Sequence, residues 1–236
     1  MNYQWDWQVF LRDDGSGRTY IEWMFSAWGW TLSVAACAWI IALALGSMVG
    51  TLRTVPQRSW QRLGDAWVEL FRNIPLLVHL FLWYHVIPAL VTPLREVPSF
   101  LLVVFALGFF TSARVAEQVR AGIQSLARGQ RYAGLALGLT LPQTYRFVLL
   151  PMAFRIVLPP LTSEAMNIIK NSSVAFAVSV AELTMFAMQA QEETSRGIEV
   201  YLAVTGLYAL SAFSVNRAMA LVERKVRVPG YVGGER

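Results

Sequence analysis

The sequence predicts an all-α integral membrane protein with about five transmembrane helices. Hydrophobic residues make up 56% of its 236 residues and charged residues only 15%, whereas an average soluble domain carries about 25% charged residues. A bilayer core about 30 Å thick requires about 20 helical residues, and the uncharged run 30–52 is long enough to cross it. Much of the chain is therefore expected to face lipid.

Four further apolar segments complete the predicted set of spans: residues 74–93, 98–113, 165–190 and 198–213. The first span is not expected to be a cleaved signal peptide, because an acidic, tryptophan-rich leader precedes it instead of a short basic one. We predict an external amino-terminal segment (1–27), one membrane domain (28–222) containing a loop at about 121–151, and a cytoplasmic tail (223–236).

Basic residues predict the orientation, since loops rich in Arg and Lys stay in the cytoplasm. Eleven of the 20 basic residues follow the first span, separate the third from the fourth, or follow the fifth: Arg53, Arg58, Arg62, Arg120, Arg128, Arg131, Arg146, Arg217, Arg224, Lys225 and Arg227. The two loops on the other side contain only Arg95 and Arg196. The amino terminus is thus expected outside and the carboxyl terminus in the cytoplasm. The net charge of +5 then reflects membrane topology, because the cations are too scattered to form a nucleic-acid groove.

The sequence lacks the residues that several functions would require. A phosphate-binding loop ends in Gly-Lys-Ser or Gly-Lys-Thr, but neither Lys170 nor Lys225 follows a glycine, so this chain is not expected to bind ATP or another cofactor. His79 and His85 are six residues apart and are expected on opposite helix faces, which predicts no metal site. No catalytic residues are expected, and the single Cys37 is expected to be buried.

The loop at 121–151 is rich in small residues. Helix-forming segments at 124–126 and 132–137 are interrupted by Gly129, Gly138 and Pro142, which predicts two short helices with a bend at Gly138. The small side chains of Ala133 and Gly134 would let this surface seat closely in the groove of a partner protein. The alternative is a plain interfacial helix that links two spans.

The same loop resembles a family signature. Tyr132-Ala133-Gly134, then Gly138, then Val148 and Leu150-Pro151 resemble the coupling loop of ABC importer permeases, which reads Glu-Ala-Ala, three residues, Gly, nine residues, Ile-x-Leu-Pro. Tyr132 replaces the usual Glu. Residues 69–77, Glu-Leu-Phe-Arg-Asn-Ile-Pro-Leu-Leu, are similar to a motif of the polar amino acid permeases (histidine and glutamate uptake), and segments 129–134 and 171–175 resemble the glutamate/aspartate branch.

This resemblance implies an ABC transporter type 1 permease domain in the bacterial inner membrane. It implies import of a polar, acidic L-amino acid such as glutamate or aspartate, powered by two partner ATPase subunits that bind ATP and Mg. A second permease subunit, identical or related, and an external solute-binding protein complete the implied assembly. The implied ATPase-coupling residues are Tyr132, Ala133, Gly134 and Gly138. The alternatives are a gradient-driven carrier or channel, a permease of this family for glutamine or another amino acid, and a non-transporting scaffold.

Lys170 leads to a predicted substrate pathway. An ionisable residue at the centre of a span costs about 2.5–3.5 kcal/mol on insertion scales, so Lys170 is not expected to face lipid. Helical spacing places Asn167, Lys170 and Asn171 on one face. The predicted pathway comprises Arg72, Asn167, Lys170, Asn171 and Ser172, with Lys170 and Arg72 attracting substrate carboxylates.

Structural roles are the competing interpretation for these residues, and the polar face with Asn167, Lys170 and Asn171 could instead line the interface with a second permease subunit. Glu164 could pair with Lys170 or Arg155, and Glu69 could pair with Arg72 three residues away. Glu182 is expected near the outer end of the fourth span, exposed to water and without special chemistry. The pair at 159–160, Pro-Pro, is expected either to break the chain before the polar face or to start a helix.

Overall fold

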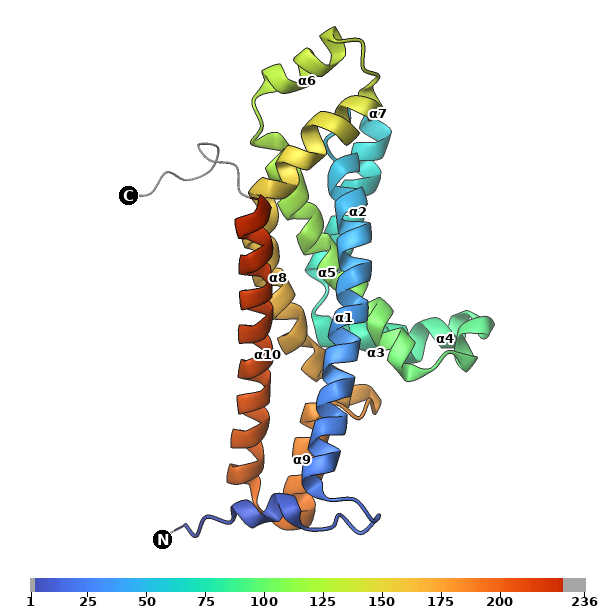
Figure 1. Ribbon diagram of the computed structural model, residues 1–236. Coiled ribbons are helices and arrows are strands. Elements are labelled where there is room, and N and C mark those ends of the chain that lie inside the picture. The colour runs from blue at the N-terminus through green and yellow to red at the C-terminus, as the bar shows by residue number, and fades with distance from the viewer. Residues whose placement is uncertain (1–2, 227–236) are drawn as a thin grey trace. The chain divides into compact units, whose positions relative to one another are not determined.

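The computed structural model describes residues 3–226, and these residues form helices without a β-strand (Figure 1). Their contacts divide them into two compact units. Unit 1 comprises the described residues of Met1–Ala38, Leu76–Leu107 and Asn167–Ser214, and unit 2 comprises Trp39–Pro75, Gly108–Met166 and the described residues from Val215 onward. The part of the predicted tail at 227–236 lies outside the described residues.

Long apolar helices confirm the predicted class of fold. Four helical segments are long and apolar enough to cross a membrane: α1 (Tyr20–Leu52), α5 (Ser99–Gln124), the run Leu141–Val178, and α10 (Gly197–Val226). A fifth candidate is a bent pair, Arg58–Asn73 with Leu76–Leu90, whose two parts meet at 104°. Four or five candidate spans agree with the prediction of about five.

The second span is more irregular than predicted. The predicted segment 74–93 contains α3 (Leu76–Phe81), a π-helical turn (Leu82–Val86) and α4 (Ile87–Leu90), and a 3₁₀ turn (Thr92–Glu96) begins near its end. The candidate bent pair also includes α2 (Arg58–Asn73), which precedes the predicted segment. The sharp bend falls at Pro75, which has no backbone N–H to donate and which disfavours a helical conformation in the residue before it. Pro75 therefore explains why the helix is interrupted at this point.

The predicted position of the fourth span, 165–190, is wrong. The structure places the candidate span at Leu141–Val178, built from α7 (Leu141–Thr144), a π-helical turn (Tyr145–Leu149), α8 (Leu150–Asn171) and a 3₁₀ segment (Ser172–Val178). The chain then turns at Ser179, whose φ is 60°, and begins a separate helix, α9 (Leu183–Thr194). An apolar run by itself does not reveal such a turn.

Two smaller expectations also fail. Pro159 and Pro160 lie inside α8 and neither start nor interrupt it, as membrane helices permit when other groups satisfy the freed carbonyls. Cys37 is exposed on α1 and not buried.

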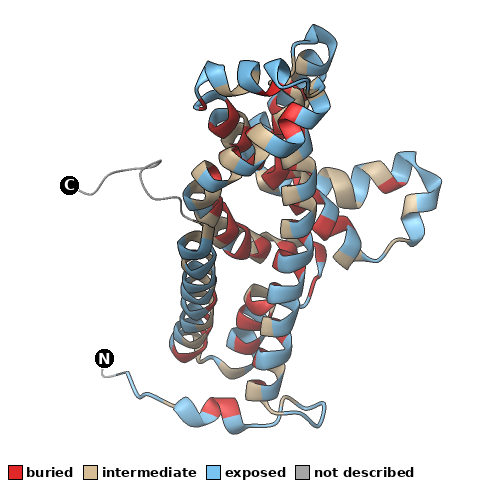
Figure 2. Ribbon diagram, turned by 45° about the horizontal axis from the view of Figure 1, so that its top comes forward, coloured by how far each residue is buried: buried red, intermediate tan, exposed pale blue. Residues whose placement is uncertain are grey.

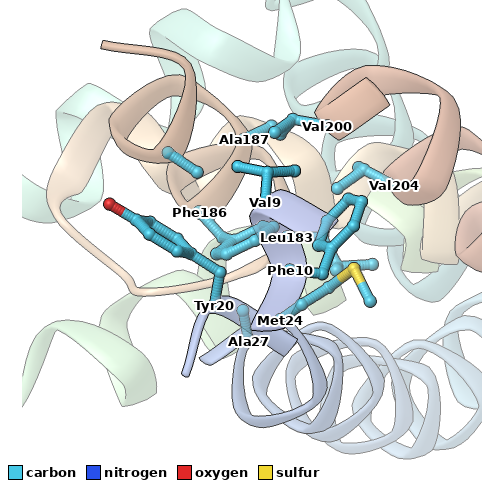
Figure 3. Packing of buried hydrophobic residues seen from close by; sticks show 11 residues of the cluster. Val9, Phe10, Tyr20, Met24, Ala27, Leu183, Phe186, Ala187, Val200 and Val204 are labelled. Atoms are coloured by element: carbon cyan, nitrogen blue, oxygen red, sulfur yellow. The ribbon is translucent and has the colours of Figure 1, made fainter. Parts of the chain in front are cut away.

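In unit 1, the amino-terminal leader packs against α9 and α10. A 3₁₀ turn (Trp7–Leu11) directs Val9 and Phe10 into a buried cluster with residues of α1, α9 and α10 (Figure 3). Hydrogen bonds reinforce this packing: the Tyr20 hydroxyl donates to Glu193 at 2.7 Å, and the backbone N–H of Asp6 donates to Glu199 at 2.8 Å. The leader is therefore an ordered part of unit 1.

In unit 2, glycines allow neighbouring helices to approach closely. A Cβ added at Gly46 of α1 would lie 2.5 Å from Val115 Cβ of α5, and one at Gly122 of α5 would lie 2.3 Å from Val157 Cγ1 of α8. Small residues at helix contacts are typical of membrane proteins, where close packing takes over much of the role of the hydrophobic effect.

The outer surface of α10 is apolar as well. Leu202, Leu210, Phe213 and Leu221 are all exposed on this helix, and Figure 2 shows exposed residues along most of its length. Such a surface requires lipid or another apolar partner to cover it.

Candidate coupling and transport sites

The loop between α5 and α8 has the predicted form. The helix α6 (Arg128–Ala136) is followed by Gly138 in the left-handed region, with φ of 84°, and then by α7. Thr140 and Gln143 form a capping box at the start of α7, and Pro142 occupies its first turn, where proline costs no hydrogen bond. Two short helices, α6 and α7 (Figure 1), with a bend at Gly138 are confirmed. Gly129 lies within α6 and does not interrupt it.

The four predicted coupling residues have different environments. Tyr132 is 67% exposed, and Ala133 and Gly138 are also exposed. Gly134 is buried, and a Cβ there would lie 2.8 Å from Thr144 Cγ2. Gly134 therefore packs α6 onto the start of the following helical run, while the other three residues are available at the surface.

The polar face of α8 is only partly available for ligands. Lys170 is exposed and has no ion pair within residues 3–226, and Asn167 and Asn171 are half-buried. Ser172 is buried, and its hydroxyl donates to the Ile169 carbonyl at 2.7 Å. Its hydrogen-bonding donor is therefore already used within its own helix.

Arg72, the remaining predicted pathway residue, belongs to unit 2 and lies in a cluster of charges. Its guanidinium is 3.8 Å from the carboxylate of Glu117 on α5, and no ion pair with Glu69 is present in the described residues. The expected Glu69–Arg72 pair is therefore wrong. The same Glu117 accepts from Arg53 Nη1 at 2.5 Å, and Arg53 Nε donates to Asp65 at 2.7 Å.

Glu164 also has a partner that the sequence did not reveal. Its carboxylate lies 3.9 Å from the guanidinium of Arg114 on α5, and neither Lys170 nor Arg155 forms an ion pair with it in the part of the chain described. The structural ion pair considered for Lys170 is therefore absent.

Glu182 is completely buried, which overturns the expectation of an exposed residue. Its carboxylate accepts hydrogen bonds from the backbone N–H groups of Thr184 at 2.9 Å and Met185 at 3.0 Å, and from the Tyr208 hydroxyl at 2.7 Å. A carboxylate at this position satisfies free N–H groups at the start of α9 and interacts favourably with the helix dipole. Glu182 thus joins α9 to α10. The one signal for this role in the sequence is that Glu182 directly precedes the residues that form α9.

These features define the class of the protein: a polytopic, all-helical membrane protein that presents a short helix between two of its spans. Residues 42–228 match the family described as binding-protein-dependent transport system inner membrane component, and the chain belongs to this family. It is a permease subunit of an ABC importer and is located in the inner membrane.

Individual relatives support this assignment. The chain is 45% identical to the glutamate/aspartate import permease protein GltJ of Escherichia coli (strain K12), over 100% of both chains. It is 35% identical to the probable glutamine ABC transporter permease protein GlnM of Bacillus subtilis (strain 168), over 79% of this chain and 87% of GlnM.

Two solved structures are similar. A crystal structure of an amino acid ABC transporter with histidines matches with a TM-score of 0.75 and 30% identity, over 87% of this chain and 95% of the other. An inward-facing MetNI methionine ABC transporter has a TM-score of 0.78 at 20% identity, over 92% of this chain and 100% of the other, and this second likeness concerns the fold alone.

Proposed function

We propose that this permease imports glutamate or aspartate into the cytoplasm. The observation that carries the proposal is the 45% identity to a glutamate/aspartate import permease over the full length of both chains. The relative named for glutamine is less similar, at 35% identity over 79% of this chain. A gradient-driven carrier or a scaffold is not favoured, because the family transports with a binding protein.

The proposed assembly contains three further kinds of component. Two ATPase subunits bind ATP with Mg and supply the energy, an external solute-binding protein delivers the amino acid, and a second permease subunit completes the pathway. A related second subunit is supported by GltK of E. coli O157:H7, also named a glutamate/aspartate import permease, which is 27% identical over 83% of this chain.

The proposed topology places the amino terminus outside, with 1–27 external, 28–222 as the permease domain and 223–236 in the cytoplasm. The ATPase then contacts the loop at 121–151. Tyr132 and Ala133 form its exposed contact surface, Gly138 supplies the turn, and Gly134 holds α6 against Thr144. Movement of the ATPase would pass through this packed contact into α8.

In the proposed pathway, Lys170 attracts the side-chain carboxylate of the substrate. The support is its exposed ammonium without an ion pair in the described chain, on the same helix as Asn167 and Asn171. Ser172 lines the proposed pathway without donating its hydroxyl to the substrate, because that hydroxyl donates to the Ile169 carbonyl. Arg72 attracts the substrate carboxylate more weakly than Lys170 does, because Glu117 lies beside Arg72.

Uptake by proteoliposomes that contain the assembled partners tests this function. Labelled glutamate should enter only with internal ATP, and unlabelled aspartate should compete more strongly than glutamine. A Gly138→Trp variant should lose uptake, since a bulky side chain at a left-handed position strains the loop. Gly17→Trp is the matched control, because Gly17 has φ of 87° and open space around it, as Gly138 has. Uptake driven by an ion gradient without ATP would overturn the proposal.

A further inference from the structure

A basic cavity of about 380 Å³ lies in unit 2, where α1 and α5 end and α6 begins. Arg53, Arg128 and Arg131 contribute to its wall, together with polar groups of Gln124 and Thr54. The cavity thus lies beside the ends of two candidate spans, since α1 ends at Leu52 and α5 at Gln124.

The charge of the cavity is not balanced. Arg53 is paired with Asp65 and Glu117, but Arg128 and Arg131 have no ion pair within the described residues, and no carboxylate is among the residues described as lining the cavity. The Nε of Arg131 is buried without a hydrogen-bond partner. A buried charged donor without an acceptor is unfavourable, so this arrangement is complementary to an anion that offers several oxygens.

An apolar cavity of about 440 Å³ adjoins the basic one. Both cavities are lined by Tyr145, whose hydroxyl donates to the Thr54 carbonyl at 2.8 Å. The wall of the apolar cavity includes Leu52, Trp60 and Leu150, and Arg146 is the charged residue among those that line it. Tryptophan is enriched at membrane interfaces. A basic cavity and an apolar cavity that share Tyr145 in their walls are complementary to a molecule with an anionic head and a hydrocarbon chain.

We propose that this pair of cavities binds an anionic phospholipid, with its phosphate between Arg128 and Arg131 and its acyl chain beyond Tyr145. Basic pockets between membrane helices are suited to anionic headgroups. A soluble phosphate would use the same arginines, but it would leave the adjoining apolar cavity unexplained. The occupant would tie the start of α6 to the ends of α1 and α5.

Lipid binding to the purified full chain, with the subunits that co-purify, tests the proposal. Fluorescent phosphatidylglycerol should bind at least about tenfold more tightly than phosphatidylcholine. The variant Arg128→Gln/Arg131→Gln should weaken phosphatidylglycerol binding about 30-fold, since each basic residue near the headgroup contributes about a factor of five. The matched control Arg58→Gln/Arg62→Gln also removes two charges, from exposed positions on α2 outside the cavity, and should change binding less than twofold.

If the double variant does not fold, Arg128→Gln alone is sufficient, because Arg128 is exposed, and a fivefold loss is expected. Three results would overturn the proposal. The first is selectivity for phosphatidylglycerol that survives in the Arg128→Gln/Arg131→Gln variant. The second is binding of inorganic phosphate that depends on Arg128 and Arg131 while the two lipids bind equally, which would assign the site to free phosphate. The third is loss of the ATPase subunit from this double variant while lipid selectivity is kept, which would assign the arginines to the ATPase.

Discussion

Arg53 and Glu117 join the end of α1 to α5 through a hydrogen bond of 2.5 Å between guanidinium and carboxylate. The side chain of Arg53 is only 6% exposed, and Asp65 accepts its second hydrogen bond. Glu117 also lies near Arg72, so one carboxylate organises the charges of three helices. Removing one partner of a buried pair leaves the other charge uncompensated, which costs more than the intact pair contributes.

Replacing Arg53 with Gln is therefore expected to destabilise the protein by about 2 kcal/mol, somewhat below the range for fully buried pairs because Glu117 is partly exposed. Denaturant unfolding of the purified protein in detergent would measure the loss. Arg62→Gln removes an exposed charge from α2 and should change the free energy of unfolding by less than about 0.5 kcal/mol. Equal effects of the two substitutions would contradict the role given to the cluster.

Gly122→Ala should also destabilise the protein, by about 1–3 kcal/mol, because its new methyl group would overlap Val157 where α5 packs on α8. Thermal unfolding would show the change, and adding Val157→Ala should restore part of the loss. Gly206→Ala is the control, since a Cβ at this position of α10 meets no atom within 4 Å. A Gly122→Ala protein as stable as the Gly206→Ala protein would show that the helices separate there.

Asp14 provides a prediction about pH. Hydrogen bonds from Ser16, together with the guanidinium of Arg18, lower the pKa of this carboxyl from 3.8 to about 2. A carboxyl with a lowered folded-state pKa stabilises the fold above its unfolded pKa. The contribution is thus complete above about pH 5 and is lost as the pH falls through about 2.

Carbon NMR of the labelled aspartate carboxyls would measure this titration, with Asp14→Asn assigning the resonance. In a Ser16→Ala variant, the pKa of Asp14 should move back toward 3.8, because the hydroxyl that stabilises the carboxylate is gone. A titration of Asp14 near 4 in the unmodified protein would rule out the loop geometry described here.

Lys170→Met separates the pathway role of Lys170 from a structural one. If the ammonium attracts a substrate carboxylate, the KM for glutamate uptake should rise at least about tenfold, the loss of roughly 1.4 kcal/mol. Uptake assays with the assembled partners provide the measurement. Lys225→Met is a matched control, because Lys225 is the other lysine of the chain and lies in the last turn of α10. Unchanged uptake and specificity in Lys170→Met would eliminate the substrate role.

The sequence by itself determined the all-helical membrane class, the approximate number of spans and the bend at Gly138. These properties depend on local chemistry: an apolar run of sufficient length must leave water, and a glycine between two helix-forming segments accepts the left-handed conformation that other residues resist. The spacing from Tyr132 to Pro151 also indicated the permease family to which the chain belongs.

The tertiary structure decided which groups meet. Arg72 lies beside Glu117 and not Glu69, and Glu164 lies beside Arg114 and not Lys170. The fourth candidate span is Leu141–Val178 and not 165–190, because the chain turns at Ser179 and buries Glu182 at the start of α9. Hydropathy averages over a segment and helical spacing relates residues on one helix, whereas ion pairs and caps depend on how different helices pack. These partners could therefore be found only in three dimensions.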